Sequence, residues 1–561
     1  MSAANNEAEE VRNRLLRRGD WRFLLPDASP ARTVCFVDGE LARVTELISR
    51  RVPEAEALAS GNCDLAIAAD PDSTTLRSAW AALRAGGVCY TEWSEAGVWG
   101  TRAVRQRLSG AGFESVTCFA PWPHPVRSLP SAWVPLEAAG PLRHLVTRGG
   151  SGHSWAQRVL EGLRRAAWIV RTRLGLGSPI CVMARKPSTE AAHHPGGEPA
   201  PQPELLEEIR HRWEGWGLGP RPSTLSWLLL TSGGRSINKV VRLVFAGSDR
   251  PRLVLKMSRV AEAAAGLARE ASVLRELQSS GREVRGVPKL LFEGVRAGVP
   301  TIVETALPGV PLPTRLRRES YRDLALLGTD WLVAFAGQAE AHPPTAWHSR
   351  LIDTTVGTFE ASFGGVVDPG LVRESAAVLA TLGPLPIVCE QRDFSPWNLL
   401  ISSEEELQVL DWESAEPQGL PVMDLVYFTS HLAFYLAGAR TPERCRECYR
   451  ETLWASTFTG GVRQECEERY AERVGVRAAD IAPLRLLCWM VHSRSEFRRF
   501  AADVGGVPPP TLLRRSLFVS LWEEELRGLL QTGPLGSSRA RDVPLRSSFA
   551  SGGRVGPPRI W

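Results

Sequence analysis

The stretch from Asp393 to Asp411 is the feature of the sequence that most restricts how the chain can fold. Two short apolar runs, residues 399–401 and 407–410, flank a polar turn, and this pattern predicts a β-hairpin. Asn398 comes just before the first strand and Asp411 just after the second. In an antiparallel pair these two positions meet at the same open end, where neighbouring strands lie about 4.8 Å apart. Asp393, five positions before Asn398, belongs to the same cluster.

The side chains of this cluster suit metal-assisted phosphoryl transfer. A carboxylate and an amide oxygen held together are the kind of ligands that Mg²⁺, a hard cation, accepts. We therefore expect Asn398 and Asp411 to hold Mg²⁺. Asp393 would accept the proton of an attacking hydroxyl while the metal holds the phosphates. Asp and Asn are also common turn residues, so an ordinary hairpin without a site is the alternative.

A lysine and a glutamate upstream form the second part of the pattern. Residues 253–256 predict an apolar strand that ends in Lys256, and the helix after it carries Glu270 between Leu267 and Leu274. At about 100° per residue, Glu270 lies in the middle of the apolar stripe. A buried carboxylate without a cationic partner is costly, so we expect an ion pair with Lys256 that orients the lysine toward nucleotide phosphates. The alternative is that Glu270 reaches solvent at the edge of the helix.

Two further segments fit a nucleotide site less specifically. Gly233 and Gly234 lie between two β-runs, where the backbone amides of a turn can cover phosphates, although a Gly-Gly hairpin turn is frequent in other contexts. Residues 302–309 predict a strand that leaves into a tight turn. Such a turn suits a connector between two lobes, whose exposed backbone groups can bind a purine.

Residues 225–530 resemble the aminoglycoside phosphotransferase and choline kinase-like family of small-molecule kinases. The residues that carry the resemblance follow the family's order: Lys256, Glu270, the loop 390–398, the segment 411–413 and the segment 419–425. The resemblance implies an α+β fold with the two lobes of a protein kinase, and the use of ATP or GTP together with Mg²⁺.

The resemblance also implies a role for each matching side chain. In that family these positions are the phosphate-orienting lysine, its glutamate partner, the catalytic aspartate and two metal ligands, here Lys256, Glu270, Asp393, Asn398 and Asp411. Asp424 matches the structural aspartate that braces the catalytic loop. The chain departs from the family where His-Gly usually precedes the catalytic aspartate, because it has Gln391 and Arg392 there. The family's histidine mainly braces the loop, so its loss weakens the assignment without cancelling it.

Between residues 21 and 187 strand and helix patterns alternate, which predicts an α/β, Rossmann-like domain. The segments 63–69, 83–90 and 180–186 resemble the later strands of a class I methyltransferase. That family binds S-adenosylmethionine on a Gly-rich turn after its first strand, and no Gly-x-Gly precedes Asp64. Asp38 follows a strand and could mimic the acidic residue that binds the ribose. We expect a degenerate, structural or substrate-docking domain.

Composition restricts the number of domains, the classes of partner and the cellular compartment that are expected. A chain of 561 residues is too long for one core, so at least two domains are expected. The net charge of +5 comes with 62 acidic residues and no block of Lys and Arg, which argues against a nucleic-acid partner. No apolar run reaches the roughly 18 residues of a membrane span, so no membrane partner is expected. The ten cysteines form no disulfide framework, which favours the cytoplasm.

Segments rich in Pro and Gly divide the chain. The run from 186 to about 203 predicts no regular element, and the tail after residue 530 predicts disorder. We expect a methyltransferase-like α/β domain at 21–187, a linker at 188–222, a kinase-like phosphotransferase domain at 223–530 and a disordered tail at 531–561.

The function that fits these patterns is ATP-dependent phosphoryl transfer to a hydroxyl group of a small molecule. Asp424 follows Asp411 after 13 positions, which leaves no room for the long segment with which protein kinases dock a peptide. One alternative is a nucleotide-binding pseudokinase scaffold, which Gln391 and Arg392 suggest. Another is a methyltransferase with a kinase-like appendage. The sequence identifies neither the acceptor nor the oligomeric state.

Overall fold

The computed structural model describes most of the chain. The described residues are 3–50, 61–94, 100–122, 129–147, 179–188, 204–231, 238–280, 284–337 and 339–532, with short helical pieces between 163 and 171. They fall into two compact units. The first comprises Glu7–Arg282 with Val287–Val310, and the second comprises Met1–Asn6, Glu283–Gly286 and Pro311–Trp561. The sequence placed a division between 187 and 223 instead.

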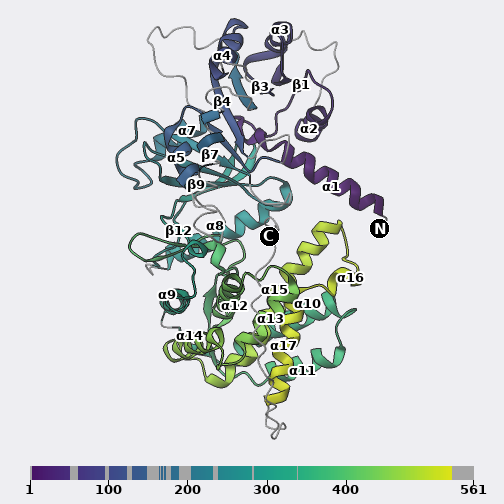
Figure 1. The fold of residues 1–561 in the computed structure, drawn as a ribbon, viewed down its shortest axis with the longest axis vertical. Helices are drawn as coiled ribbons and strands as arrows, with labels where there is room; N and C mark the ends of the chain where they lie inside the picture. The colour runs from purple at the N-terminus through teal and green to yellow at the C-terminus, as the bar shows by residue number, and fades with distance from the viewer. Residues whose placement is uncertain are drawn as a thin grey trace. The chain divides into compact units, whose positions relative to one another are not determined.

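A mixed sheet, with 11 strands among the described residues, forms the first unit (Figure 1). Its order is β1-β2-β3-β6-β4-β5-β7-β8-β9-β11-β10. The strands are β1 (Thr33–Cys35), β2 (Cys63–Ala69), β3 (Leu83–Trp93), β4 (Glu114–Trp122), β5 (Ala132–Pro135), β6 (Ile180–Arg185), β7 (Ser226–Leu230), β8 (Val240–Phe245), β9 (Pro251–Met257), β10 (Leu290–Arg296) and β11 (Val299–Thr305). The pairs β1–β2 and β2–β3 are parallel, whereas β6 lies antiparallel between β3 and β4.

One strand pair joins the N-terminal strands to the strands around Lys256. β5 and β7 are antiparallel, with Ala132 opposite Leu230 and Trp133 opposite Leu229. Trp133 and Leu229 are buried in one apolar cluster, which explains why these two strands pair instead of ending the sheet. The expected alternation of strands and helices in 21–187 is present, but its sheet continues across the boundary that the sequence suggested.

Helices cover both faces of this sheet. One face packs against α1 (Ala3–Arg18), the short helix η1 (Asp20–Leu24), α2 (Glu40–Ile48) and α7 (Glu204–Arg212). The other packs against α3 (Ser73–Ala82), α4 (Gly100–Gly110), α5 (Ala139–Thr147) and α8 (Ala264–Ser279), which follows the short helix η4 (Ala261–Ala263). α7 lies in the segment expected as a linker, and it forms because Leu206 and Ile209, three positions apart, are both buried.

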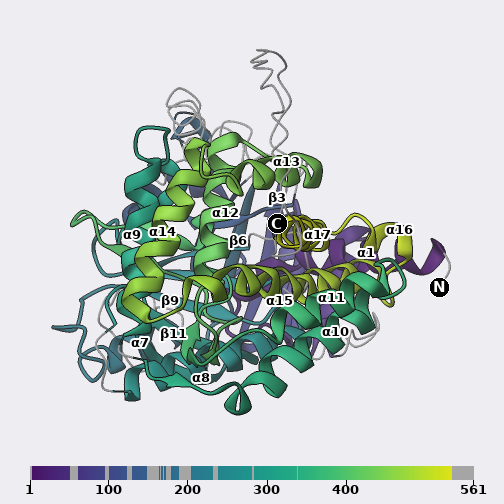
Figure 2. The same cartoon turned by 90° about the horizontal axis from the view of Figure 1, so that it is seen from below.

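The second unit is mainly helical. Its helices are α9 (Tyr321–Ala336), α10 (Thr354–Phe363), α11 (Pro369–Leu379), α12 (Met423–Ala437), α13 (Pro442–Thr452), α14 (Phe458–Val474), α15 (Ala478–Val504), α16 (Pro510–Leu513) and α17 (Leu517–Thr532), with the shorter η5 (Leu312–Thr314), η6 (Pro344–Ala346), η7 (Ser349–Asp353) and η8 (Pro396–Asn398). The long helix α15 packs against α10, α11 and α17 (Figure 2). No helix in the described part of the chain has the length and apolar character needed to cross a membrane.

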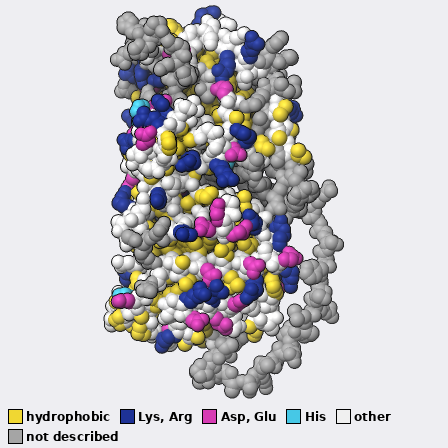
Figure 3. Space-filling model, turned by 90° about the vertical axis from the view of Figure 1, so that its left-hand side faces the viewer, with side chains coloured by type: hydrophobic (Ala, Val, Ile, Leu, Met, Phe, Trp, Pro, Cys, Tyr) yellow, Lys and Arg dark blue, Asp and Glu magenta, His cyan; other side chains and the backbone are white. Residues whose placement is uncertain are grey.

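The second unit also contains short strands, which pair in small sheets. They are β13 (Ala341–His342), β14 (Leu385–Pro386), β15 (Val388–Glu390), β16 (Leu399–Ile401), β17 (Leu407–Val409) and β18 (Glu416–Gly419), while β12 (Val310–Pro311) lies where the chain passes between the units. Apart from the end of α17, the expected disordered tail lies outside the described residues. On the face that Figure 3 shows, basic and acidic side chains are interspersed.

Candidate active site

Lys256 and Glu270 form a buried ion pair in the first unit. Lys256 is the sixth residue of the strand β9, and α8 carries Glu270 on the face that packs against β10 and β11. The distance from Lys256 Nζ to Glu270 Oε1 is 2.6 Å, and the glutamate side chain is fully buried. The pairing expected from the helical stripe is therefore present. The nucleotide-binding role of the two residues stays a prediction.

Two further charged residues, which the sequence analysis missed, join this pair. Lys239 Nζ lies 3.1 Å from Glu270 Oε2, and Lys256 Nζ lies 2.8 Å from Glu304 Oε1. Burial raises the pKa of Glu304 to about 7, against the opposing effect of Lys256. The signal for Glu304 was a carboxylate within the apolar strand 301–304, on the face that the register shares with Lys256. Gly233 and Gly234 lie outside the described residues.

The predicted hairpin is present in the second unit. β16 and β17 pair antiparallel, with Leu399 opposite Val409. The backbone nitrogen of Leu410 donates a hydrogen bond of 2.9 Å to the oxygen of Asn398, which extends the pairing by one step. Asn398 and Asp411 therefore lie at the same end of the hairpin, as the sequence spacing predicts. Asp411 adopts a left-handed backbone with φ of 62°.

Asp393 is oriented by two hydrogen-bond donors. Asn398 Nδ2 donates to Asp393 Oδ2 at 2.7 Å, and it also donates to the backbone oxygen of Asp393 at 3.0 Å. The hydroxyl of Tyr427 on α12 donates to the Asp393 side chain. Burial and the nearby charge of Asp411 hold the pKa of Asp393 well above its usual range. Tyr427 was missed because only the packing of α12 brings it to the loop.

Aromatic rings hold Tyr427 in place. Its ring stacks on His492 with centroids 3.9 Å apart and lies 4.1 Å from the ring of His431. His431 Nδ1 lies 2.9 Å from the backbone oxygen of Tyr427, so Nδ1 is the protonated nitrogen. Burial lowers the pKa of His431 to about 4 and that of His492 well below its ordinary value. Both histidines are therefore neutral near pH 7.

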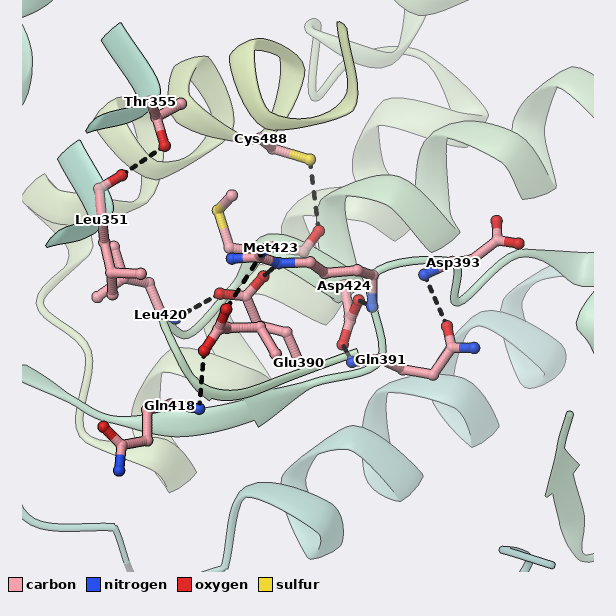
Figure 4. A network of polar contacts seen from close by, with 12 residues as sticks. Leu351, Thr355, Glu390, Gln391, Asp393, Gln418, Leu420, Met423, Asp424 and Cys488 are labelled. Carbon is pink, nitrogen blue, oxygen red and sulfur yellow. Dashed lines mark hydrogen bonds and ion pairs between the residues drawn. The ribbon is translucent and has the colours of Figure 1, made fainter. Parts of the chain in front are cut away.

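A network of hydrogen bonds braces the loop that carries Asp393 (Figure 4). The carboxylate of Asp424, on the first turn of α12, accepts from the backbone nitrogens of Gln391 at 2.6 Å and Arg392 at 2.8 Å. This is the geometry expected of a bracing aspartate. The Gln391 side chain accepts from the Asp393 nitrogen at 2.7 Å and donates to the Asp411 oxygen at 2.5 Å.

Arg392 occupies the position where the resembled family has glycine. Its φ of 61° is in the left-handed region, which glycine adopts freely and other residues adopt at a cost. The guanidinium compensates through an ion pair of 2.9 Å with Glu390, whose side chain is buried. Glu390 in turn accepts from the Leu420 nitrogen at 2.6 Å. The ion pair with Glu390 thus helps the chain to tolerate Arg392 where the resembled family has glycine.

The residues present fit a magnesium ion. With Asn398 Nδ2 donating to Asp393, the amide oxygen of Asn398 is available as an oxygen ligand, at the hairpin end where Asp411 also lies. Among the described residues, no group of three or more His, Cys, Asp or Glu gathers as a metal site. Two oxygen ligands suit Mg²⁺, which keeps several waters and binds the phosphates of its substrate, better than they suit an ion that needs a full protein cage.

The sequence of this region matches a known family. Residues 232–451 match the family model described as phosphotransferase enzyme family. This phosphotransferase segment includes Lys256, Glu270, Asp393, Asn398 and Asp411, so the expected resemblance of the C-terminal part, with its kinase-like fold, is confirmed. Residues 1–231 lie outside the match, and no curated protein matches the chain.

Solved structures of aminoglycoside phosphotransferases resemble the chain at low identity. They include APH(2'')-Ib with bound ADP, at 12% identity and a TM-score of 0.32, over 56% of this chain and 97% of that chain. APH(3'')-Id from Streptomyces rimosus has 14% identity and a TM-score of 0.31, over 51% of this chain and 98% of its own. A thermostable mutant of APH(4)-Ia in ternary complex with ADP and hygromycin B has 14% identity and a TM-score of 0.34, with coverages of 56% and 97%.

Proposed function

We propose that residues 223–530 form an ATP-dependent phosphotransferase that acts on a hydroxyl group of a small molecule. The observation that carries this proposal is the hydrogen bond of 2.7 Å from Asn398 Nδ2 to Asp393 Oδ2, at the hairpin end that Asp411 shares. This bond holds the Asp393 carboxylate close to the two residues that we propose as oxygen ligands, and phosphoryl transfer needs such a set of groups. The family match of residues 232–451 supports the same reaction class.

Each residue has a part in the proposed reaction. Asn398 and Asp411 would hold Mg²⁺, which supplies positive charge to the phosphates. Lys256, oriented by Glu270, would bind the nucleotide phosphates. Asp393 would accept the proton of the attacking hydroxyl, with its carboxylate held by the amide of Asn398. GTP is the alternative phosphoryl donor.

The segment after Asp411 supports a small acceptor. β18 (Glu416–Gly419) pairs with β15 (Val388–Glu390), and α12 begins at Met423. The residues between Asp411 and α12 therefore brace the catalytic loop, and they form no docking segment for a peptide.

Nucleotide binding and transfer can be tested separately. Mg·ATP at about 100 times its dissociation constant should stabilise the wild type by roughly 2.7 kcal/mol. Asp411→Ala should lose the metal-dependent part of that gain, while Asp353→Asn, at an exposed carboxylate of the same unit, should keep it. Asp393→Asn should bind nucleotide nearly as well and slow transfer by about 10² to 10⁴.

The outcomes separate the proposal from its alternative. Incubation with labelled ATP and a metabolite extract should label small molecules. Nucleotide binding without transfer to any acceptor would support the pseudokinase scaffold. An unchanged metal-dependent shift in Asp411→Ala would reject the metal assignment.

For residues 21–187 we propose a degenerate methyltransferase-like domain. The parallel strands β1 to β3, followed by β6 inserted antiparallel between β3 and β4, support an α/β origin of this part. The segment before Asp64 lacks the Gly-x-Gly that close approach of a cofactor requires. Calorimetry on the full chain should detect no binding of S-adenosylmethionine, and micromolar affinity would instead favour an active methyltransferase with a kinase-like appendage.

A further inference from the structure

Four charged side chains in the first unit, three of them buried and Lys239 partly buried, form one continuous row. Lys239 contacts Glu270, Glu270 contacts Lys256, and Lys256 contacts Glu304, at distances of 3.1, 2.6 and 2.8 Å. The residues come from the segment before β8, from α8, from β9 and from β11. Two lysines and two glutamates make the row neutral when all four are ionised. A proton on either glutamate would leave one positive charge.

The two carboxylates in this row differ in how many of their oxygens have a lysine partner. Glu270 has a lysine on each of its oxygens, whereas Glu304 has Lys256 on Oε1 alone. Within the described part of the chain, Glu304 Oε2 is buried and accepts no hydrogen bond. A buried carboxylate oxygen without a donor is costly when the group is ionised. Glu304 is therefore the weaker partner of Lys256.

The groups that face Glu304 explain which of the two glutamates can take a proton. The pKa of Glu304 is raised to about 7, because burial, the largest influence, and the charge of Glu270 raise it more than Lys256 and Lys239 lower it. The neighbouring strand β10 and helix α8 also carry Glu293 and Arg275, but these two side chains pair with each other at the surface. Glu304 therefore gains or loses its proton near neutral pH.

We propose that Glu304 is a positioning residue for the nucleotide, which holds Lys256 until a phosphate replaces it and takes up a proton when it is displaced. This inference rests on the proposed role of Lys256 in binding phosphates. A phosphate and the Glu304 carboxylate compete for the same ammonium group, and two adjacent anions repel each other. Displacement of Glu304 removes its cationic partner, so the carboxylate becomes neutral by accepting a proton from solvent. Glu270, held by two lysines, stays in place and keeps Lys256 oriented.

The proposal is tested by counting protons during nucleotide binding to the full chain. Mg·ADP is titrated calorimetrically at pH 8 in two buffers of different ionisation enthalpy, where the terminal phosphate of the nucleotide, with a second pKa of about 6, is already ionised. The wild type should take up close to one proton. Its affinity should fall by up to about tenfold per pH unit between pH 7 and 8.

Two variants separate the proposal from a purely structural role. Glu304→Gln keeps the size of the side chain but has no charge, so it should bind Mg·ADP without proton uptake and with affinity that does not depend on pH. Glu293→Gln, at the exposed glutamate of β10, should behave as the wild type. The wild-type measurement needs no variant. Binding without proton uptake by the wild type would overturn the proposal even if Glu304→Gln fails to fold.

Each result decides a different claim. Proton uptake in the wild type that is lost in Glu304→Gln supports the proposal. Binding without proton uptake by the wild type, or equal uptake by both proteins, would overturn this role of Glu304 and leave the proposed phosphotransferase intact. Absence of nucleotide binding at every pH would overturn the proposed function and this inference together.

Discussion

Gln391 ties the loop that carries Asp393 to the end of the hairpin, because its Nε2 atom donates a hydrogen bond of 2.5 Å to the backbone oxygen of Asp411. The same nitrogen donates to the Leu410 oxygen at 3.1 Å, and the amide oxygen accepts from the Asp393 nitrogen at 2.7 Å. One fully buried amide therefore sets the distance between the two aspartates. This is the bracing that the resembled family obtains from a histidine.

Replacement of this amide should weaken the loop. Gln391→Met keeps the length of the side chain but removes the hydrogen bonds to the oxygens of Leu410 and Asp411 and from the nitrogen of Asp393. We expect the free energy of unfolding to fall by about 1 to 3 kcal/mol, the cost of unsatisfied buried polar groups. Urea unfolding measures this change, with Gln464→Met, at an exposed glutamine of α14, as the control. Equal stability of the two variants would show that the amide does not brace the loop.

Arg392→Gly tests how the left-handed backbone is compensated. Glycine removes the conformational cost of a φ of 61°, about 1 to 2 kcal/mol, but it also leaves the buried carboxylate of Glu390 without its guanidinium. Loss of one partner of a buried pair costs about 3 to 5 kcal/mol, so we expect a net loss near 2 kcal/mol. The double variant Glu390→Gln/Arg392→Gly should recover most of it. If Arg392→Gly is as stable as the wild type, the loss of the ion pair does not outweigh the relief of the left-handed backbone.

Tyr427→Phe should affect transfer more than nucleotide binding. The hydroxyl donates to the Asp393 carboxylate, and a hydrogen bond to a charged group is worth about 1.5 to 3 kcal/mol. If it orients the base in the transition state, its loss should lower kcat by about 10- to 100-fold. Tyr435→Phe, at a half-buried tyrosine two turns further along α12, serves as the control. Equal effects on kcat and on the dissociation constant for nucleotide would point to a general packing defect.

His431 should make the protein sensitive to acid. Its pKa is lowered by burial from 6.5 to about 4, so the folded state binds its proton less readily than the unfolded chain. The stability that follows is present above pH 6.5 and is lost as the pH falls through 4, by up to about 3 kcal/mol. His431→Phe should show a shallower fall of unfolding free energy with acid, although His492 acts in the same direction. His211→Gln, at an exposed histidine of α7, should match the wild type, and an identical pH profile in His431→Phe would reject the effect.

The parts of the site that the sequence predicted are local in the chain. The hairpin follows from two apolar runs around a turn, and Asn398 and Asp411 are at its ends because register is fixed over a few residues. The partner of Glu270 was predictable because a buried carboxylate requires a cation and Lys256 is the lysine at the end of the preceding strand. Local patterning and simple electrostatics suffice for these features.

The residues that the sequence analysis missed depend on contacts between distant segments. Glu304 faces Lys256 only through the register of β11 against β9. Tyr427 reaches Asp393 through the packing of α12, although the two residues are far apart in sequence. The sheet order is likewise non-local, because no periodicity in β5 indicates that its neighbour is β7.

The pairing of β5 with β7 has a consequence for work with fragments of the chain. Expression of residues 204–532 alone would remove β5 from beside β7 and make β7 a sheet edge, with unpaired backbone groups at Leu229 and Leu230. It would also remove the Phe119 ring that packs on Trp227. Open edges of this kind recruit strands from other molecules. We therefore expect the N-terminal strands to protect this edge from pairing with other molecules, and a shortened chain to need a redesigned edge to stay monomeric.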